Sequence, residues 1–266
     1  TSNPYSFSWP NVSTGTYNIT AKAFDNGNAS SDSSTVTITV GTITTPPGGD
    51  LPKRILVGYW HNFNNGSSIP KLREVSDKWD VINVSFAIPT VPNGATMTFT
   101  PDPAIYSSVQ EFKDDVALLQ SRGKKVLISM GGATGAVDVD SPADAQAFSS
   151  SMVNIINTYG FDGMDIDFEG SSVSLAAGDN DFMNPTSPKL VHLITAFRSI
   201  LSQYSADFIL SMAPETLYVQ GGFSGYGGPS GAYLPLIYAL RNEMDYIHVQ
   251  HYNTGCMLGL DGLCYS

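Results

Sequence analysis

The chain has 266 residues, which is enough for one large domain or for one large and one small domain. Lys and Arg number 13 against 24 Asp and Glu, so the formal net charge is −11. This acidity argues against nucleic acid and against an anionic membrane surface as partners, because both require a basic face, and no stretch of the sequence is long and apolar enough to span a bilayer.

Residues 1–42 differ in composition from the rest of the chain. They are rich in Ser, Thr, Asn and Val, and the runs TYNITAKAFD and STVTITV alternate in period two around the turn-rich DNGNASSDS. This pattern predicts a hairpin of an all-β module. The composition resembles the last strands of a fibronectin-III or immunoglobulin-like sandwich, but a complete sandwich needs about 100 residues. We therefore expect a partial β-sandwich module over 1–42.

A linker is predicted next, over residues 43–52, because this stretch contains Pro-Pro-Gly-Gly. From residue 53 onward, short apolar runs alternate with longer helical patterns. Strands are predicted at 54–60, 80–87, 124–132, 161–169, 207–215 and 244–253, and helices at 103–122, 142–159 and 189–204. Ser141, Pro142 and Gly160 are the expected cap, first residue and end of the second helix, and Gly123 ends the first.

Strand–helix alternation predicts an α/β domain with a parallel sheet. Polar and aromatic residues end the strands, as they do at the active-site face of a TIM (β/α)8 barrel. A doubly wound open sheet is the alternative, although no G-x-G-x-x-G or P-loop follows the first strand. Only six strands are predicted, and about 215 residues are available where a barrel usually has about 250. We expect residues 53–266 to form a (β/α)8 catalytic domain that is truncated after its sixth strand, incomplete at the C-terminus.

The segment FDGMDIDFEG, residues 161–170, carries the chemistry. Side chains alternate across a strand, so Asp165, Asp167 and Glu169 share one face while large apolar residues occupy the other. The apolar face suits packing on helices, which directs the carboxylates to the barrel interior. Like charges a few ångströms apart cannot all ionise, so at least one proton is shared among them. A carboxylic acid that stays protonated near neutral pH is what glycosidic bond cleavage requires. Asp162 has the opposite parity, and we interpret it as structural.

Four motifs occur in strand order. Asp162, Asp165, Asp167 and Glu169 form D-x-x-D-x-D-x-E; S-x-G-G lies at 129–132, SMAPE at 211–215 and Q-x-Y-N at 250–253. Together they resemble family 18 glycoside hydrolases, the retaining chitinases, and within them the bacterial chitinase D type, from residue 53 to the end of the chain.

The resemblance implies substrate-assisted catalysis without a cofactor or metal. Glu169 would protonate the leaving glycosidic oxygen, and the 2-acetamido oxygen of the substrate would attack the anomeric carbon. Asp167 would orient the acetamido N–H, Asp165 beneath it would exchange a proton, and Tyr252 would hydrogen-bond the acetamido group. Water activated by Glu169, or a second sugar in transglycosylation, would open the oxazolinium intermediate with retention. The expected substrate contacts are Tyr59, Trp60, Ser129, Gly131, Gly132, Met212, Glu215, Gln250 and Asn253.

Several aromatic, cysteine and histidine residues carry further expectations. Phe86 is expected to pack in the core rather than contact sugar, whereas Tyr218 is expected near the cleft. Cys256 and Cys264 either close a small disulfide loop or remain free thiols. His248 and His251 look like strand residues, and no zinc site is predicted.

The predicted function is endo-acting hydrolysis of β-1,4-linked N-acetylglucosamine in chitin or chito-oligosaccharides, by a secreted, monomeric bacterial enzyme. One alternative is an endo-β-N-acetylglucosaminidase acting on glycoprotein glycans. Another is an inactive, lectin-like chitin-binding protein, against which the presence of Glu169 argues.

Overall fold

The computed structural model describes residues 9, 12, 15–40, 51–252 and 254–265. The chain divides into two compact units, Thr1–Thr44 and Thr45–Ser266, each with its own internal contacts. No helix in the described part of the chain combines the length and apolar character needed to cross a bilayer.

The first unit contains the predicted hairpin. β1 (Gly15–Ile19) pairs antiparallel with β4 (Val36–Val40), and β2 (Lys22–Phe24) pairs antiparallel with β3 (Ser30–Asp32) between them. The turn that joins β2 to β3 is held by Asp25, whose Oδ1 accepts hydrogen bonds from the amides of Gly27 and Ala29 at 2.8 and 2.9 Å. An aspartate that bonds its own following backbone is a typical turn former.

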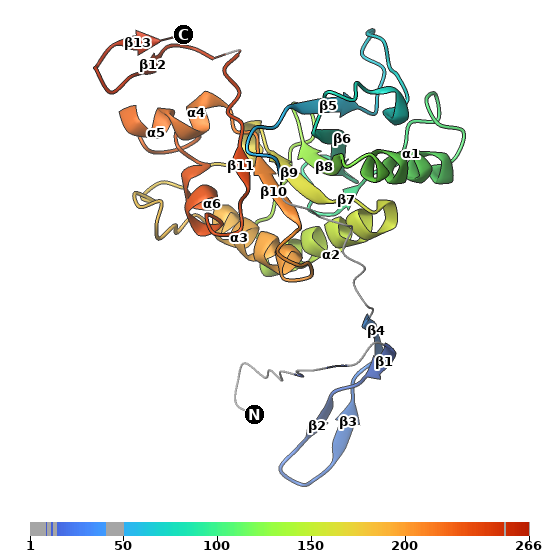
Figure 1. The fold of residues 1–266 in the computed structure, drawn as a ribbon. Coiled ribbons are helices and arrows are strands. Elements are labelled where there is room, and N and C mark those ends of the chain that lie inside the picture. The colour runs from blue at the N-terminus through green and yellow to red at the C-terminus, as the bar shows by residue number, and fades with distance from the viewer. Residues whose placement is uncertain (1–8, 10–11, 13–14, 41–50, 253, 266) are drawn as a thin grey trace. The chain divides into compact units, whose positions relative to one another are not determined.

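The second unit is built on a curled parallel sheet (Figure 1). Its strands are β5 (Val57–His61), β6 (Val81–Pro89), β8 (Lys125–Gly131), β9 (Gly163–Asp167), β10 (Ile209–Met212) and β11 (Tyr246–Ile247). All six predicted strands are therefore present. β7 (Met97–Thr98) adds to the end of β6 in the antiparallel sense.

The order of the strands selects between the two predicted architectures. Consecutive parallel strands of the chain are neighbours in the sheet, in the order β5-β6-β8-β9-β10-β11. A doubly wound sheet reverses its order at a switch point, and this sheet does not. The sheet is the consecutive βα winding of a TIM barrel, in six of the barrel's eight strands.

Helices lie along the outer side of the sheet (Figure 1). They are α1 (Val109–Ser121), α2 (Pro142–Tyr159), α3 (Pro188–Leu201) and α6 (Leu234–Ala239), with short α4 (Thr216–Val219), α5 (Gly221–Ser224), η1 (Leu72–Glu74) and η2 (Gly170–Ser172) in the connections. The predicted caps of α2 are confirmed: Ser141 Oγ accepts from the Asp144 amide at 3.2 Å, and Gly160 ends the helix in the left-handed region at φ 73°. The predictions that α1 starts at 103 and that α3 extends to 204 are wrong. α1 starts later because Ser108 is its cap, accepting from the Glu111 amide at 3.1 Å, and Ser202 caps α3 at its C-terminal end.

The outer face of β9 carries the apolar side chains that the alternation in the sequence predicted for it. Met164, Ile166 and Phe168 are buried in the main apolar core, where Phe168 contacts Phe148 of α2 and Phe197 of α3. The alternate residues of the strand therefore face the barrel interior.

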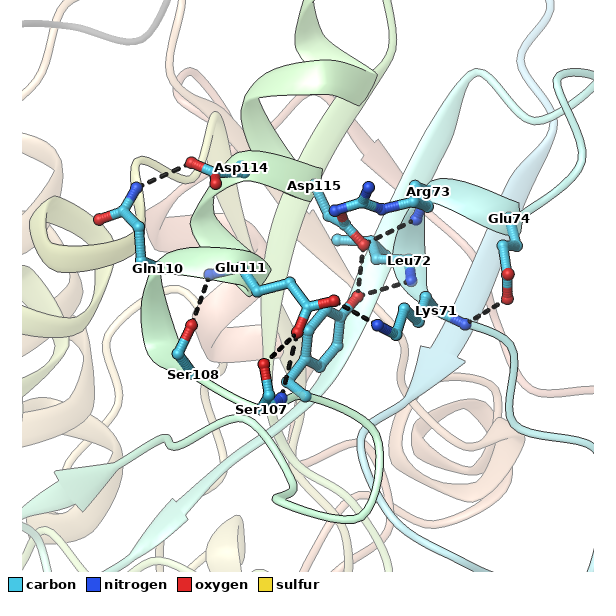
Figure 2. Close-up of polar contacts among 11 residues, drawn as sticks. Lys71, Leu72, Arg73, Glu74, Ser107, Ser108, Gln110, Glu111, Asp114 and Asp115 are labelled. Carbon is cyan, nitrogen blue, oxygen red and sulfur yellow. Dashed lines mark hydrogen bonds and ion pairs between the residues drawn. The ribbon is translucent and has the colours of Figure 1, made fainter.

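A polar cluster fastens η1 to α1 (Figure 2). Asp115 of α1 is completely buried and accepts hydrogen bonds from the Tyr106 hydroxyl at 2.8 Å and the Arg73 amide at 3.2 Å. The Arg73 guanidinium pairs with the same carboxylate, and the Tyr106 oxygen accepts from the Leu72 amide at 2.7 Å. This cluster holds the connection between β5 and β6 against the helix layer.

The described chain ends in a small hairpin of β12 (Met257–Leu258) and β13 (Cys264–Tyr265). A disulfide joins Cys256 to Cys264, which resolves the two alternatives left open by the sequence.

Candidate active site

Asp165 lies at the centre of the interior face and is completely buried. Its Oδ2 accepts hydrogen bonds from Tyr59 Oη at 2.7 Å and Ser129 Oγ at 2.8 Å. Its Oδ1 accepts from Ser211 Oγ at 2.6 Å and contacts His248 Nε2 at 3.1 Å. Four groups from four different segments of the sheet thus surround one carboxylate, which satisfies its acceptor capacity.

The sheet register explains why these groups meet. Ser129 on β8 and Ser211 on β10 are both the direct partners of Asp165 on β9. In-register residues of a pleated sheet point to the same face. Ser129 was expected to contact substrate, but it is fully buried and directs its hydroxyl to Asp165 instead of to the cavity.

Asp167 lies one step further along the same face and is 5% exposed. Its Oδ1 accepts a hydrogen bond from Gln250 Nε2 at 2.9 Å. Burial, and then the negative charges of Asp165 and Glu169, raise the pKa of Asp167 to about 8, against the opposing effect of the Gln250 hydrogen bond. For Asp165 burial acts in the same upward direction, but the hydrogen bonds and charge of its neighbours, His248 first, outweigh it and lower its pKa. The shared proton expected for the row is therefore held by Asp167.

Glu169 follows the end of β9 and is partly exposed. Gln250 Nε2 lies 3.5 Å from its Oε1, so one amide connects the last two carboxylates of the row. Both carboxylates line a cavity of about 450 Å³ that is walled by residues from several strand ends: Tyr59, His61, Phe63, Ser85, Phe86, Ala133, Ala213, His248, Val249, Gln250 and Tyr252.

This cavity adjoins a second one of about 650 Å³, which shares Phe63, Phe86 and Ala133 with it. The rings of Phe63 and Phe86 stack at a centroid distance of 6.3 Å. The expectation that Phe86 packs only in the core is therefore corrected, because its ring forms part of both cavity walls. An apolar ring wall of this kind suits the faces of sugar rings.

Two other predicted residues lie near Glu169. Tyr252 is 63% exposed and lines the cavity. Partial burial and then the charge of Glu169 raise the pKa of Glu215, which places this carboxylate within electrostatic reach of the row. Asn253 falls outside the described residues.

Trp60 and Met212 do not belong to the cavity. Trp60 is 3% exposed, packs against Tyr106 and Phe112, and donates its indole N–H to the Pro70 carbonyl at 2.8 Å. Met212 is fully buried in the same outer core. Neighbouring residues of a strand point to opposite faces, so once Tyr59 and Ser211 face the interior, Trp60 and Met212 cannot. Their assignment as substrate contacts is wrong.

Gly131 and Gly132 allow a close backbone approach and are not among the residues that line the cavity. A Cβ on Gly131 would lie 2.5 Å from the Asp167 carbonyl oxygen, and one on Gly132 would lie 2.8 Å from the Phe86 ring; both residues have positive φ, 101° and 72°. The Gly132 amide donates to the Asp167 carbonyl at 2.7 Å. The S-x-G-G motif thus lets the end of β8 approach the carboxylate strand.

Two further predictions concern residues beside the site. Asp162 is buried and accepts hydrogen bonds from the Val126 amide at 2.8 Å and Gln120 Nε2 at 3.0 Å, which confirms its structural role. Tyr218 is 4% exposed and donates its hydroxyl to the Gly170 carbonyl at 2.9 Å. It supports the turn after Glu169 instead of facing the cleft.

The sequence reasoning missed Ser211 and His248. Ser211 precedes Met212, and His248 lies two residues before Gln250. The alternation of side chains along each strand was the sequence signal that could have identified both residues. Among the described residues, no group of three or more His, Cys, Asp and Glu side chains has an arrangement suited to a metal ion.

A barrel strand that carries three carboxylates toward a cavity at its C-terminal end defines a glycoside hydrolase type of site. Residues 55–257 match the model of the glycosyl hydrolases family 18, and the chain belongs to this family.

Individual relatives agree with this assignment. The chain is 55% identical over 253 residues to chitinase D of Niallia circulans, covering 94% of this chain and 48% of the relative. It is 54% identical over 252 residues to chitinase Chi52 of Paenibacillus xylanexedens, covering 94% and 47%. The chain spans about half the length of these curated relatives. Among solved structures, a family GH18 chitinase from Chromobacterium violaceum aligns with a TM-score of 0.69 at 36% identity, covering 91% of this chain and 66% of that one.

Proposed function

We propose that the protein is a retaining chitinase that cleaves β-1,4-linked N-acetylglucosamine by substrate-assisted catalysis. The observation that carries this proposal is the carboxylate row itself. Asp165 is surrounded by four polar partners, and burial and neighbouring charge hold Asp167 protonated near neutral pH. Glu169 lines the cavity, and Gln250 connects it to Asp167. The relatives at 55% and 54% identity are named chitinases, which favours chitin over glycoprotein glycans as the substrate.

In the first step Glu169, in its protonated form, donates its proton to the glycosidic oxygen as the bond to the anomeric carbon breaks. The reactive form of the row therefore carries a proton on Glu169 as well as the one on Asp167. The leaving sugar departs with a hydroxyl group. The carbonyl oxygen of the substrate's own 2-acetamido group bonds to the anomeric carbon from the other side, which forms a cationic oxazolinium ring. Tyr252 and Asp167 are placed on the cavity wall to hold the acetamido group in the attacking orientation.

Asp165 supports this step as a fixed anion. Its two oxygens are occupied by Tyr59, Ser129, Ser211 and His248, which leaves no lone pair directed at a proton from Asp167. This arrangement supports a static negative charge beneath the oxazolinium rather than the proton exchange that the family resemblance implied. Preorganised charge of this kind stabilises a developing cation without reorganisation.

In the second step a water molecule attacks the anomeric carbon from the side that the leaving group vacated. Glu169, now a carboxylate, takes the proton of this water, and the bond to the acetamido oxygen breaks. Two inversions at one carbon give net retention.

The two cavities at the site support a role on polymeric chitin. The two adjoining cavities, of about 450 and 650 Å³, provide room for more than one sugar ring.

We assign residues 53–266 to the catalytic domain, 43–52 to the linker and 1–42 to a partial fibronectin-III- or immunoglobulin-like module. The disulfide between Cys256 and Cys264 supports export, because such bonds persist in oxidising compartments, and we propose that the enzyme acts outside the cell as a monomer.

The proposal is tested by offering the intact protein colloidal chitin and a high-mannose glycoprotein in parallel. Release of soluble N-acetylglucosamine oligomers from chitin alone is the expected result, with the β-anomer appearing first in the proton NMR spectrum. Release of glycan from the glycoprotein alone, or the α-anomer as first product, would contradict it.

A further inference from the structure

His248 lies directly after β11 and reaches into the interior of the sheet. Its backbone amide donates to the Met212 carbonyl at 3.0 Å. Its Nε2 lies 3.1 Å from Asp165 Oδ1 and 3.2 Å from Tyr59 Oη. The imidazole ring stacks on the Tyr59 ring at a centroid distance of 5.5 Å and an interplanar angle of 24°, and it lines the cavity. The ring is thus held by contacts on two sides.

The chemistry of these contacts fixes the hydrogen on Nε2. An ionised carboxylate only accepts hydrogen bonds, so its contact with Nε2 requires an Nε2–H. The Tyr59 hydroxyl hydrogen is already directed to Asp165 Oδ2 at 2.7 Å. The Tyr59 oxygen therefore offers a lone pair to the same Nε2–H, and His248, Tyr59 and Asp165 form one connected network.

We propose that His248 is a positioning residue of the carboxylate row, whose Nε2–H completes the hydrogen-bond shell of Asp165 and keeps this carboxylate ionised while the proton of the row stays on Asp167. This inference rests on the proposed function. Where two neighbouring carboxylates compete for one proton, the one with the better donors stays ionised. The other three donors to Asp165 are hydroxyl groups, whereas His248 supplies the single ring N–H among them.

None of the other titratable groups near His248 supplies a ring N–H to Asp165. Asp165 contacts His248 from β9 and Tyr59 contacts it from β5. The ring of Tyr246, from β11, has its centroid 5.6 Å from that of the imidazole. Asp167, Glu169 and His61 line the same cavity. Burial raises the pKa of Tyr59 and of Tyr246, so both hydroxyls stay neutral through the working range. Neither tyrosine therefore carries a charge in the network.

A matched pair of variants separates the donor from the volume of the side chain. Gln can place an amide N–H near the position of Nε2, whereas Met has nearly the same size and no donor. The intact protein, H248Q, H248M and the control H251Q are assayed for kcat on an N-acetyl-chito-oligomer from pH 4 to pH 9. His251 is exposed and lies outside the cavity wall. Thermal melting of each variant establishes that it is folded at the assay temperature.

For H248M we expect the acidic limb of the kcat profile to move upward by roughly one pH unit or more, because a hydrogen bond to a charged group stabilises it by about that amount. The alkaline limb should stay in place, since Asp165 is ionised there in every variant. H248Q should keep the wild-type acidic limb, and H251Q should match the wild type throughout.

Three outcomes would overturn the inference. They are a wild-type acidic limb in H248M, an equal loss of kcat in H248M and H248Q with unshifted limbs, or an acidic limb in H248Q that moves as far as in H248M. Failure of the proposed function looks different, because the unmodified protein would then show no turnover of the oligomer at any pH.

Discussion

Ser211 Oγ donates a hydrogen bond to Asp165 Oδ1 at 2.6 Å from the position directly opposite Asp165 in the register of β9 and β10. The charge at the centre of the site is therefore tied to the register of the sheet. A shift of one residue would bring Leu210 or Met212 opposite Asp165 and leave a buried carboxylate short of a donor.

Replacing Glu169 with Gln should strongly reduce turnover while leaving the fold intact. The amide keeps the shape of the side chain but cannot donate a proton to the glycosidic oxygen, so kcat on a chitin oligomer should fall by roughly 10²–10⁴-fold. The check is the rate of reducing-end release. Glu243→Gln is the matched control, because Glu243 is exposed and lies away from the cavity. Wild-type turnover in E169Q would remove Glu169 from the mechanism.

Replacing Asp167 with Asn should stabilise the protein, and the gain should grow with pH. The folded-state pKa of Asp167 is raised from 3.8 to about 8, so the native state binds this proton over a range in which the unfolded chain releases it. The unfolding free energy of the wild type therefore falls as pH rises from about 4 to about 8, whereas the neutral amide is insensitive.

The measurement is the difference in melting temperature between D167N and the wild type. It should be near zero at pH 4 and reach roughly 3 °C or more at pH 8, because each kcal/mol corresponds to about 2–4 °C in a chain of this size. The same substitution at exposed Asp207 should give no such trend. A gain that is independent of pH would mean that Asp167 is ionised in the native state.

Replacing Gly131 with Ala should destabilise the chain and impair the site together. The new Cβ would meet the Asp167 carbonyl oxygen at 2.5 Å at a residue whose φ is 101°. Relief requires β8 to move away from β9, at a cost of about 2 kcal/mol or more. Urea unfolding measures this cost. Gly225→Ala serves as the control, since a Cβ there has open space; equal effects at both positions would argue against the close approach of the strands.

Replacing Asp115 with Ala should cost about 2–3 kcal/mol of unfolding free energy, because it leaves the buried Tyr106 hydroxyl and the Arg73 amide without an acceptor (Figure 2). Denaturant titration gives the value. Asp114 precedes it on α1 and contacts only the side chain of Gln110 among its polar neighbours in Figure 2, so D114A should be close to neutral. A similar loss from both substitutions would show that helix propensity, not the cluster, is responsible.

Strand parity accounts for both the successes and the errors of prediction from the sequence. It separated Asp165 and Asp167 from Met164 and Ile166, and the structure confirms this division. The same rule, applied to adjacent residues elsewhere, excludes two of the predicted contacts: Tyr59 and Trp60 cannot share a face, nor can Ser211 and Met212. Choosing the interior member of each pair required the register with β9, which local patterns do not contain.

The sequence by itself determined which residues make up the carboxylate row, since alternation along one strand is a local property of the chain. It also determined the six strands and the family to which they belong. Only the tertiary structure decided which carboxylate carries the proton. That outcome depends on donors from β5, β8, β10 and the segment after β11, which converge on Asp165 and leave Asp167 buried beside the Asp165 anion. Burial and charge proximity are properties of the assembled sheet, because they arise between strands that are far apart in the chain.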